Sequence, residues 1–369
     1  MMSAETAGPI VRGCCHVYYA LDIGFSVNLK RCAGLIQEAR EEGGLQRHAR
    51  APAYLNLRPA PVHVIQTIEP IQGPTFLTEN RVTITIYDFG AVSVEYRIPF
   101  EGTLDQMAAL SSELYDNQQF AADARARAES LLIAIGPAVQ RANVREEVED
   151  YLIFEIPSLV EGGPDLAEIL RDRGQVLAQV LSSNTQGLSH QQRREELSRH
   201  IAYDDDLTII TWNAAMVFGT KMDDVLTVLE LANVQLRELH YLDDRLDDSL
   251  QESYDIRARA KSVKASMDRI RELMLDGQAF SEAVTNAFKP SPDAFLARVY
   301  ALASRALGLE HFDRSIKDKL SLLNTLYATL SDEADHERSV RLEWIVIILI
   351  FIEIVMGFSE RLLPLFHRG

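Results

Sequence analysis

One apolar run near the C-terminus constrains this chain more than any other feature. The fifteen residues from Trp344 to Phe358 contain a single charged residue, Glu353. As a helix that rises about 1.5 Å per residue they would span about 22 Å, which is short of the roughly 30 Å hydrocarbon core of a bilayer. Apolar flanking residues and a tilted helix can make up the difference, so the run is compatible with a membrane-spanning segment.

Two kinds of structure could cover such a run. Its apolar residues favour insertion into a bilayer by on the order of 5 kcal/mol, and an acidic residue at mid-depth opposes insertion by roughly 3 kcal/mol. We therefore predict a transmembrane helix and tail over residues 339–369, with Trp344 at the membrane interface. The alternative is a helix buried on all sides within a homo-oligomer. In both cases we expect Glu353 to be neutral or paired with Arg341 or Arg361 of a neighbouring subunit.

The composition narrows the classes of function. The 369 residues are 47% hydrophobic and carry a net charge of −17, which argues against non-specific binding to nucleic acid and against a DNA partner. The three cysteines form no Cys-x-x-Cys motif, so we predict neither a zinc site nor a disulfide framework and expect a reducing compartment. The N-terminal residues show no secretory signal, so we expect the chain to be anchored at its C-terminus.

The clearest β pattern lies between Arg81 and Ile98. Alternating apolar residues are interrupted there by the tetrapeptide Tyr87-Asp88-Phe89-Gly90. A glycine can supply the positive φ angle that a tight hairpin needs. The pattern predicts an antiparallel hairpin, with this tetrapeptide as a candidate motif.

The pattern becomes helical from Met222 onward. Apolar residues recur every three or four positions as far as Tyr254, which predicts one helix of at least thirty residues with coiled-coil packing. We therefore divide the chain into a mixed α+β domain (1–220), a helical coiled-coil domain (221–338) and a C-terminal hydrophobic helix with its tail (339–369). The predicted fold class is α+β, with an N-terminal mixed α/β domain that contains the hairpin and a C-terminal domain of long helices.

Two clusters of charged residues are candidates for binding or catalysis. Arg47, Arg50 and Arg58 form the only notably basic patch and could contact nucleic acid, although a solvated loop is the more common meaning of such a patch. The acidic run Asp204–Asp206, with Asp88 or Glu95, could serve a metal-dependent hydrolase.

Catalytic motifs do not support an enzyme. The sequence contains no His-Glu-x-x-His, no P-loop and no Gly-x-Ser-x-Gly. We therefore favour a protein that is not an enzyme, and we predict no catalytic residue, no metal and no cofactor.

Several segments resemble a known family. They are Arg341-Leu-Glu-Trp with the isoleucine-rich run to Ile354, Tyr87–Gly90, Ser291–Phe295 and Leu322–Asn324. Together they resemble the family called "required for meiotic nuclear division", a domain-of-unknown-function family of bacteria, fungi and animal mitochondria. The resemblance implies membrane-anchored homo-oligomers whose soluble part lies on the cytoplasmic or matrix side. It also implies a role like that of the animal mitochondrial member, which supports mitochondrial translation.

These observations lead to one expected function and two alternatives. We expect a non-enzymatic, membrane-anchored homo-oligomeric scaffold or tether, which supports translation at the cytoplasmic face of a bacterial inner membrane or at the mitochondrial inner membrane. Its expected partners are other copies of itself, the lipid bilayer, and the ribosome or RNA. The residues expected to serve the oligomer and the membrane are Arg341, Glu343, Trp344 and Glu353. The alternatives are a metal-dependent hydrolase and an RNA-binding adaptor.

Overall fold

The computed structural model describes residues 10–41, 45–48, 59–159, 166–202, 206–219, 222–259 and 294–366, with eight further positions between 268 and 278. The chain forms two compact units. One unit comprises Met1–Leu242 with Phe280–Arg314, and the other comprises Asp243–Ala279 with Ser315–Gly369.

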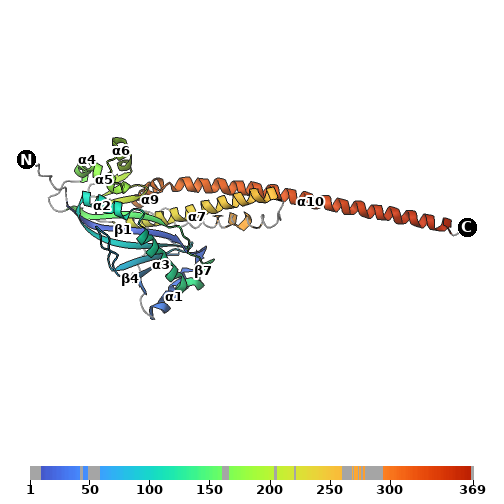
Figure 1. Cartoon of the computed structure of the whole chain (residues 1–369), viewed down its shortest axis with the longest axis horizontal. Helices are drawn as coiled ribbons and strands as arrows, with labels where there is room; N and C mark the ends of the chain where they lie inside the picture. Colours follow the sequence, from blue (N-terminus) through green and yellow to red (C-terminus); the bar gives the residue numbers. More distant parts are fainter. Residues whose placement is uncertain are drawn as a thin grey trace, which may run out of the picture. The chain divides into compact units, whose positions relative to one another are not determined.

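The first unit is built on a nine-stranded sheet with the strand order β3-β4-β5-β6-β1-β8-β11-β10-β9 (Figure 1). All its strand pairs are antiparallel except β8 with β11. The strands are β1 (Ile10–Asp22), β3 (Leu45–His48), β4 (Val62–Thr67), β5 (Arg81–Ile86), β6 (Ala91–Thr103), β8 (Glu149–Leu159), β9 (His200–Ala202), β10 (Leu207–Ile210) and β11 (Ala214–Phe218). A separate pair joins β2 (Ser26–Val27) to β7 (Val139–Gln140).

The helices follow the chain between and after these strands. They are α1 (Leu29–Glu41), α2 (Leu104–Leu114), α3 (Gln118–Ile135), a 3-10 turn (Gly136–Ala138), α4 (Leu166–Asp172), α5 (Gly174–Ser182), α6 (His190–Ser198), α7 (Asp223–Arg259), α9 (Ala294–Ala306) and α10 (Leu309–Phe366). The predicted α+β class is therefore confirmed, with a mostly antiparallel N-terminal sheet and C-terminal helices.

One face of the sheet forms the main core. The odd-numbered residues of β1, such as Val17, Tyr19 and Leu21, are fully buried there with the even-numbered residues of β6. Helices α1 to α5 contribute the other side of this core. This apolar packing fixes the register of the central strands, because a slip of one residue would turn every apolar side chain to the opposite face.

The opposite face of the sheet is different in character. It carries the even-numbered residues of β1, among them His16, Tyr18 and Ala20, which are also buried. Helix α7 packs on this face, where its Leu231 and Val234 join Ala20 in a small apolar cluster. The α7 side of the sheet is therefore buried, yet it holds most of the polar residues of the central strands.

The long helix predicted from Met222 is confirmed. Helix α7 has 37 residues and α10 has 58. Within the second unit the two helices are joined by an ion pair, because Lys319 Nζ lies 2.8 Å from Asp243 Oδ1 and 2.7 Å from Asp247 Oδ1. Side-by-side packing of two such helices is the arrangement that the apolar spacing indicates.

The prediction of a transmembrane helix is wrong. Between Glu343 and Glu353 the uncharged run comprises only the nine residues Trp344–Ile352, which as a helix span about 13 Å, less than half of a roughly 30 Å core. In the described part of the chain no helix is both long enough and apolar enough to cross a membrane. The predicted location at a bacterial or mitochondrial inner membrane, which depended on that helix, is therefore wrong as well.

Candidate functional site

A charged triad lies on the α7 side of the sheet. The three central strands β6, β1 and β8 each place one ionisable side chain there: Glu95, His16 and Glu155. His16 Nδ1 lies 2.7 Å from Glu95 Oε1, and His16 Nε2 lies 2.8 Å from Glu155 Oε2. The imidazole is only 3% exposed, and each carboxylate is 17% exposed.

The triad is most stable with a protonated histidine. An ionised carboxylate can only accept hydrogen bonds, so both ring nitrogens of His16 must donate. Burial lowers the pKa of His16, but its interactions with Cys14, Glu155 and Glu95 outweigh burial and raise that pKa well above its usual value. The site is therefore an imidazolium held between two carboxylates.

The pKa values of the two carboxylates, Glu95 and Glu155, are lowered, whereas that of His16 is raised. Burial acts to raise the pKa of Glu95, but hydrogen bonding and attraction to His16 lower it overall. The hydrogen bond from His16 likewise lowers the pKa of Glu155, against the effect of burial. All three members are therefore charged across the neutral range, and the triad carries one net negative charge before its neighbours are counted.

Helix α7 places a further carboxyl group over this site. Glu230 is 8% exposed, and its burial, reinforced by the charge of Glu95, raises its pKa to about 7. The hydroxyls of Ser93 and Thr85 and the charge of His16 oppose that rise. Glu230 is therefore the one group of this site that titrates near neutral pH.

This arrangement is suited to holding strands and charges in place. While both nitrogens of His16 donate to carboxylates, the ring has no lone pair to offer a metal ion or a proton. Among the described residues, no group of three or more histidine, cysteine, aspartate or glutamate side chains has the geometry of a metal site. The triad crosslinks three central strands through the two hydrogen bonds of His16.

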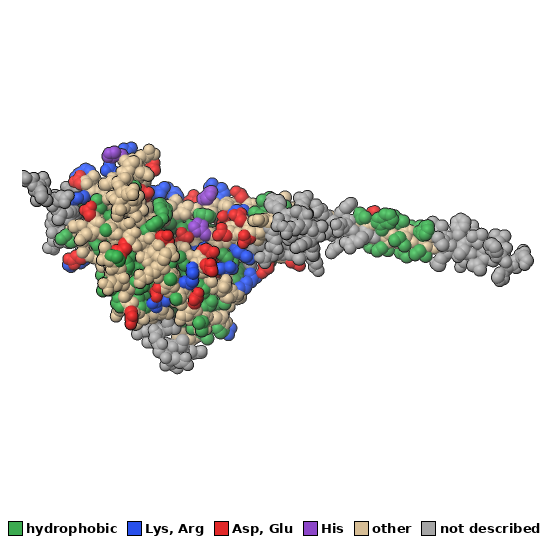
Figure 2. Space-filling model, viewed as in Figure 1, with side chains coloured by type: hydrophobic (Ala, Val, Ile, Leu, Met, Phe, Trp, Pro, Cys, Tyr) green, Lys and Arg blue, Asp and Glu red, His purple; other side chains and the backbone are tan. Residues whose placement is uncertain are grey.

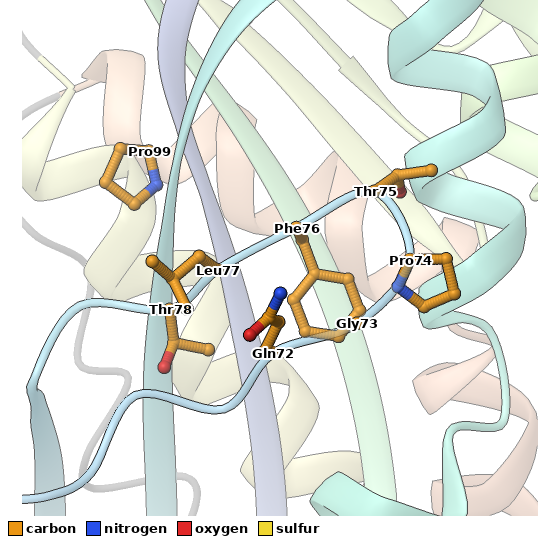
Figure 3. Close-up of a pocket in the computed structure, with 8 residues that line it drawn as sticks. All are labelled: Gln72, Gly73, Pro74, Thr75, Phe76, Leu77, Thr78 and Pro99. Atoms are coloured by element: carbon orange, nitrogen blue, oxygen red, sulfur yellow. The ribbon is translucent and has the colours of Figure 1, made fainter.

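A surface hollow lies on the other side of the first unit, at the segment between β4 and β5. It is open to solvent and is lined by Gln72, Gly73, Pro74, Thr75, Phe76, Leu77, Thr78 and Pro99 (Figure 3). Phe76 is buried against Phe120, with ring centroids 5.5 Å apart, whereas Leu77 is 55% exposed. None of the eight lining residues is ionisable, and the carboxylate of Glu113 lies beside the hollow, where it accepts from Thr75 N at 3.2 Å.

The tetrapeptide Tyr87–Gly90 forms the turn between β5 and β6, at the predicted hairpin. Tyr87 and Phe89 are buried and stack with ring centroids 5.3 Å apart in the small apolar cluster with Leu231 of α7. The carbonyl of Asp88 accepts from Val27 N at 2.7 Å. In this structure the motif is a packing surface for α7 and an attachment point for β2.

The predicted basic patch is only partly described. Arg47 lies in β3 opposite Val64. Arg50 and Arg58 lie outside the described residues, so the nucleic-acid prediction stays a prediction.

The acidic residues considered for a hydrolase are not seen together. Asp204 and Asp205 lie outside the described residues, Asp88 is in the hairpin turn, and Glu95 is bound to His16. The expected absence of a cofactor also stays a prediction.

The residues predicted for assembly all lie on α10. Glu343 and Glu353 are exposed, as is Trp344 at 61%, while the side chain of Arg341 lies outside the described part. Figure 2 shows the apolar side chains between the two glutamates as a continuous hydrophobic surface on the visible side of α10. Nothing in the structure tests the pairing predicted for Glu353.

Sequence reasoning missed the triad. The signal was present, since His16 and Glu95 each lie between apolar or aromatic neighbours, Cys15 and Val17 for the first and Val94 and Tyr96 for the second. Its meaning depends on β1 lying between β6 and β8, two strands that are remote from it in the sequence.

Comparison with known proteins places the sheet unit in a family. No curated protein matches the chain, and no solved structure matches it. Residues 12–224, more than half of the chain, match the family described as "Uncharacterized protein MJ0711, N-terminal domain". That description does not mention meiotic nuclear division. The matched range contains the whole triad and ends at the start of α7, and the chain belongs to this family of uncharacterized proteins.

Proposed function

We propose that the protein is a non-enzymatic scaffold that assembles from several copies of itself through the apolar run of α10. The observation that carries the proposal is the exposure of Trp344–Ile352, where every side chain is between 46% and 65% exposed. Nine successive helical residues point in all directions around the axis. The run is therefore apolar on every side.

Identical copies suit such a surface best. A groove on a different protein would cover one side of the helix, whereas a bundle of three or more parallel copies covers each helix from several sides. Covering a large aliphatic side chain contributes about 1.5–3 kcal/mol. Half-exposed residues along this run would together contribute on the order of 10 kcal/mol before the cost of association.

The charges that flank the run support an ordered assembly. Glu343 and Glu353 bound it at both ends, and Arg341 precedes the first of them. Charged residues at the ends of an apolar seam set register and orientation in helical bundles. Resemblance to the family called "required for meiotic nuclear division" supports the same function, because it implies homo-oligomers. Support of translation, as in the mitochondrial relative, is the role we propose for the assembled scaffold.

The proposal is tested by the mass of the full chain in detergent-free buffer. We expect light scattering to give the wild-type protein the mass of an oligomer of three or more copies. The variant Ile345→Glu/Ile348→Glu/Ile352→Glu should be a single copy, because it places three charges in the seam. Circular dichroism of both proteins checks that the sheet and helices are retained.

A matched control separates the seam from added charge. Ser321, Asn324 and Ala328 are exposed on α10 with the same spacing outside the run. Replacing all three with glutamate should leave the oligomer intact. A wild-type protein that is a single copy at all concentrations, or a control that dissociates as readily as the seam variant, would count against the proposal.

A further inference from the structure

The side of α7 that faces the sheet is unusual for a buried helix surface. Its residues Glu230, Asn233, Arg237 and Glu238 are all at least nine-tenths buried. Asn233, Arg237 and Glu238 follow Glu230 at three, seven and eight positions, which places all four along one stripe. A helix normally buries apolar residues at such positions, so this contact combines the Leu231–Val234 cluster with a row of buried polar and charged groups.

This contact leaves hydrogen-bonding capacity unused. Among the described residues, no hydrogen-bond partner is present for Asn233 Oδ1, Arg237 Nε and Glu238 Oε1, whereas Glu230 interacts with the hydroxyls of Ser93 and Thr85. Buried polar atoms without partners oppose the docked state. The contact of α7 with the sheet therefore includes buried polar atoms that weaken it, beside the apolar side chains that hold it.

Carboxyl groups meet across this contact at two places. At the first place, Glu230 faces Glu95 and His16. The charge of Glu230 also raises the pKa of the Tyr18 and Tyr87 hydroxyls, beyond the larger effect of their burial. The thiol of Cys14 and the guanidinium of Arg97 complete the polar surroundings of His16.

At the second place, Glu238 faces Asp22 at the end of β1 and neighbours Arg237. Asp22 Oδ1 accepts from Gly24 N at 2.7 Å, and Asp22 Oδ2 lies 3.8 Å from Arg145 Nε. Arg237 Nη2 lies 3.3 Å from Glu147 Oε2. The two arginines thus divide their charge between Asp22 and Glu147, and the charge of Arg237 does not offset the effects of burial and Asp22 on Glu238.

We propose that Asp223–Leu242 of α7 is a proton-controlled latch: it docks on the sheet when Glu230 and Glu238 hold protons, and it opens as the pH rises. The inference concerns the first unit alone and does not depend on assembly through α10.

The direction of the pH effect follows from the surroundings of these groups. Burial and the charge of Glu95 raise the pKa of Glu230 to about 7 in the docked state. Burial, and then the charge of Asp22, raise the pKa of Glu238 well above its usual value. With α7 undocked both groups regain ordinary values near 4.5. Docking is therefore fully favoured below that value and weakens as the pH rises through the docked values.

Hydrogen exchange of the full chain measures this directly. After correction for intrinsic rates, we expect the opening constant of Asp223–Leu242 to rise roughly 40-fold between pH 5 and pH 7 from Glu230 alone. Peptides from β1 and β6 serve as the reference for global unfolding. The dependence of this opening constant on pH in the wild-type protein tests the proposal without any variant. An opening constant that does not change with pH would overturn the proposal. So would exchange of α7 that occurs only when the whole sheet unfolds.

Two variants show whether Glu230 and Glu238 cause the rise of the opening constant with pH. Glutamine mimics a protonated glutamate, so Glu230→Gln with Glu238→Gln should flatten the rise to about threefold or less, with slow exchange retained at pH 8. Asp248→Asn, an exposed carboxylate farther along α7, should keep the wild-type slope. A double glutamine variant that keeps the full slope would contradict the assignment.

Discussion

Replacing His16 with leucine is expected to lower the free energy of unfolding by about 3–5 kcal/mol. The substitution preserves the approximate volume but removes the cation that holds Glu95 and Glu155. Two carboxylates would then remain on one buried surface without a partner. Urea unfolding at pH 6, followed by circular dichroism, gives the free energies of both proteins.

The comparison with an exposed ion pair on the same strands sharpens this prediction. Arg12 of β1 and Glu101 of β6 are joined at 2.9 Å, but both side chains are more than half exposed. Arg12→Leu should leave stability nearly unchanged, because solvent screens such pairs. A second comparison is His16→Leu with Glu95→Leu and Glu155→Leu. It should recover much of the lost stability, since an apolar replacement of a whole buried ion cluster is often neutral.

The triad also predicts a stability maximum at mildly acidic pH. The raised pKa of His16 contributes stability that is complete below about 6.5 and is lost as the pH rises through the folded-state value. The lowered pKa values of Glu95 and Glu155 contribute stability that is complete above about 4.5 and is lost on acidification. In His16→Leu the part of the loss at high pH that His16 causes should disappear, whereas the part that Glu230 and Glu238 cause should remain. If the free energy of unfolding of His16→Leu fell at high pH as steeply as that of the wild-type protein, groups other than His16 would cause the whole fall.

Gly90→Ala is expected to cost at least about 2 kcal/mol. The φ angle of Gly90 is +97°, a region that L-residues rarely adopt. A Cβ at this position would also overlap the backbone carbonyl of Gly24. That carbonyl cannot move freely, because the adjacent Ile23 N donates to Gly90 O at 2.9 Å. Thermal and urea unfolding of the variant would measure the loss.

Gly34→Ala provides a control of the opposite sign. Gly34 is exposed within α1, and an added Cβ would meet nothing within 4 Å. Alanine there should raise the stability by about 0.5–1 kcal/mol, because it reduces the entropy of the unfolded chain. Equal effects at the two glycines would contradict the reason given for Gly90.

Local patterns in the sequence were enough to predict the class of fold. The alternation between Arg81 and Ile98 identified the β5–β6 hairpin, and the spacing from Met222 identified α7, because both signals arise from neighbours in the chain. The order of strands in the sheet could not be predicted. β1 lies between β6 and β8, and that placement alone brings His16 between two glutamates.

The apolar run shows where a sequence pattern admits more than one structure. The hydropathy of a segment does not distinguish a membrane span from a helix inside an oligomer, because both environments remove apolar surface from water. Glu343 and Glu353 limit the uncharged stretch in the described chain to nine residues, and that limit rules against the membrane prediction. A run of the same composition can still be covered by other copies of the chain.

The fluorescence of Trp344 measures whether this run is covered. The chain has two tryptophans, and Trp212→Phe leaves Trp344 as the only one. In a single chain this indole is 61% exposed. In detergent-free buffer at micromolar concentration, assembly predicts blue-shifted emission that resists quenching by acrylamide. Both properties should be lost on dilution, in parallel with the fall in mass. Emission that stays red-shifted and fully quenchable at every concentration would contradict assembly through α10.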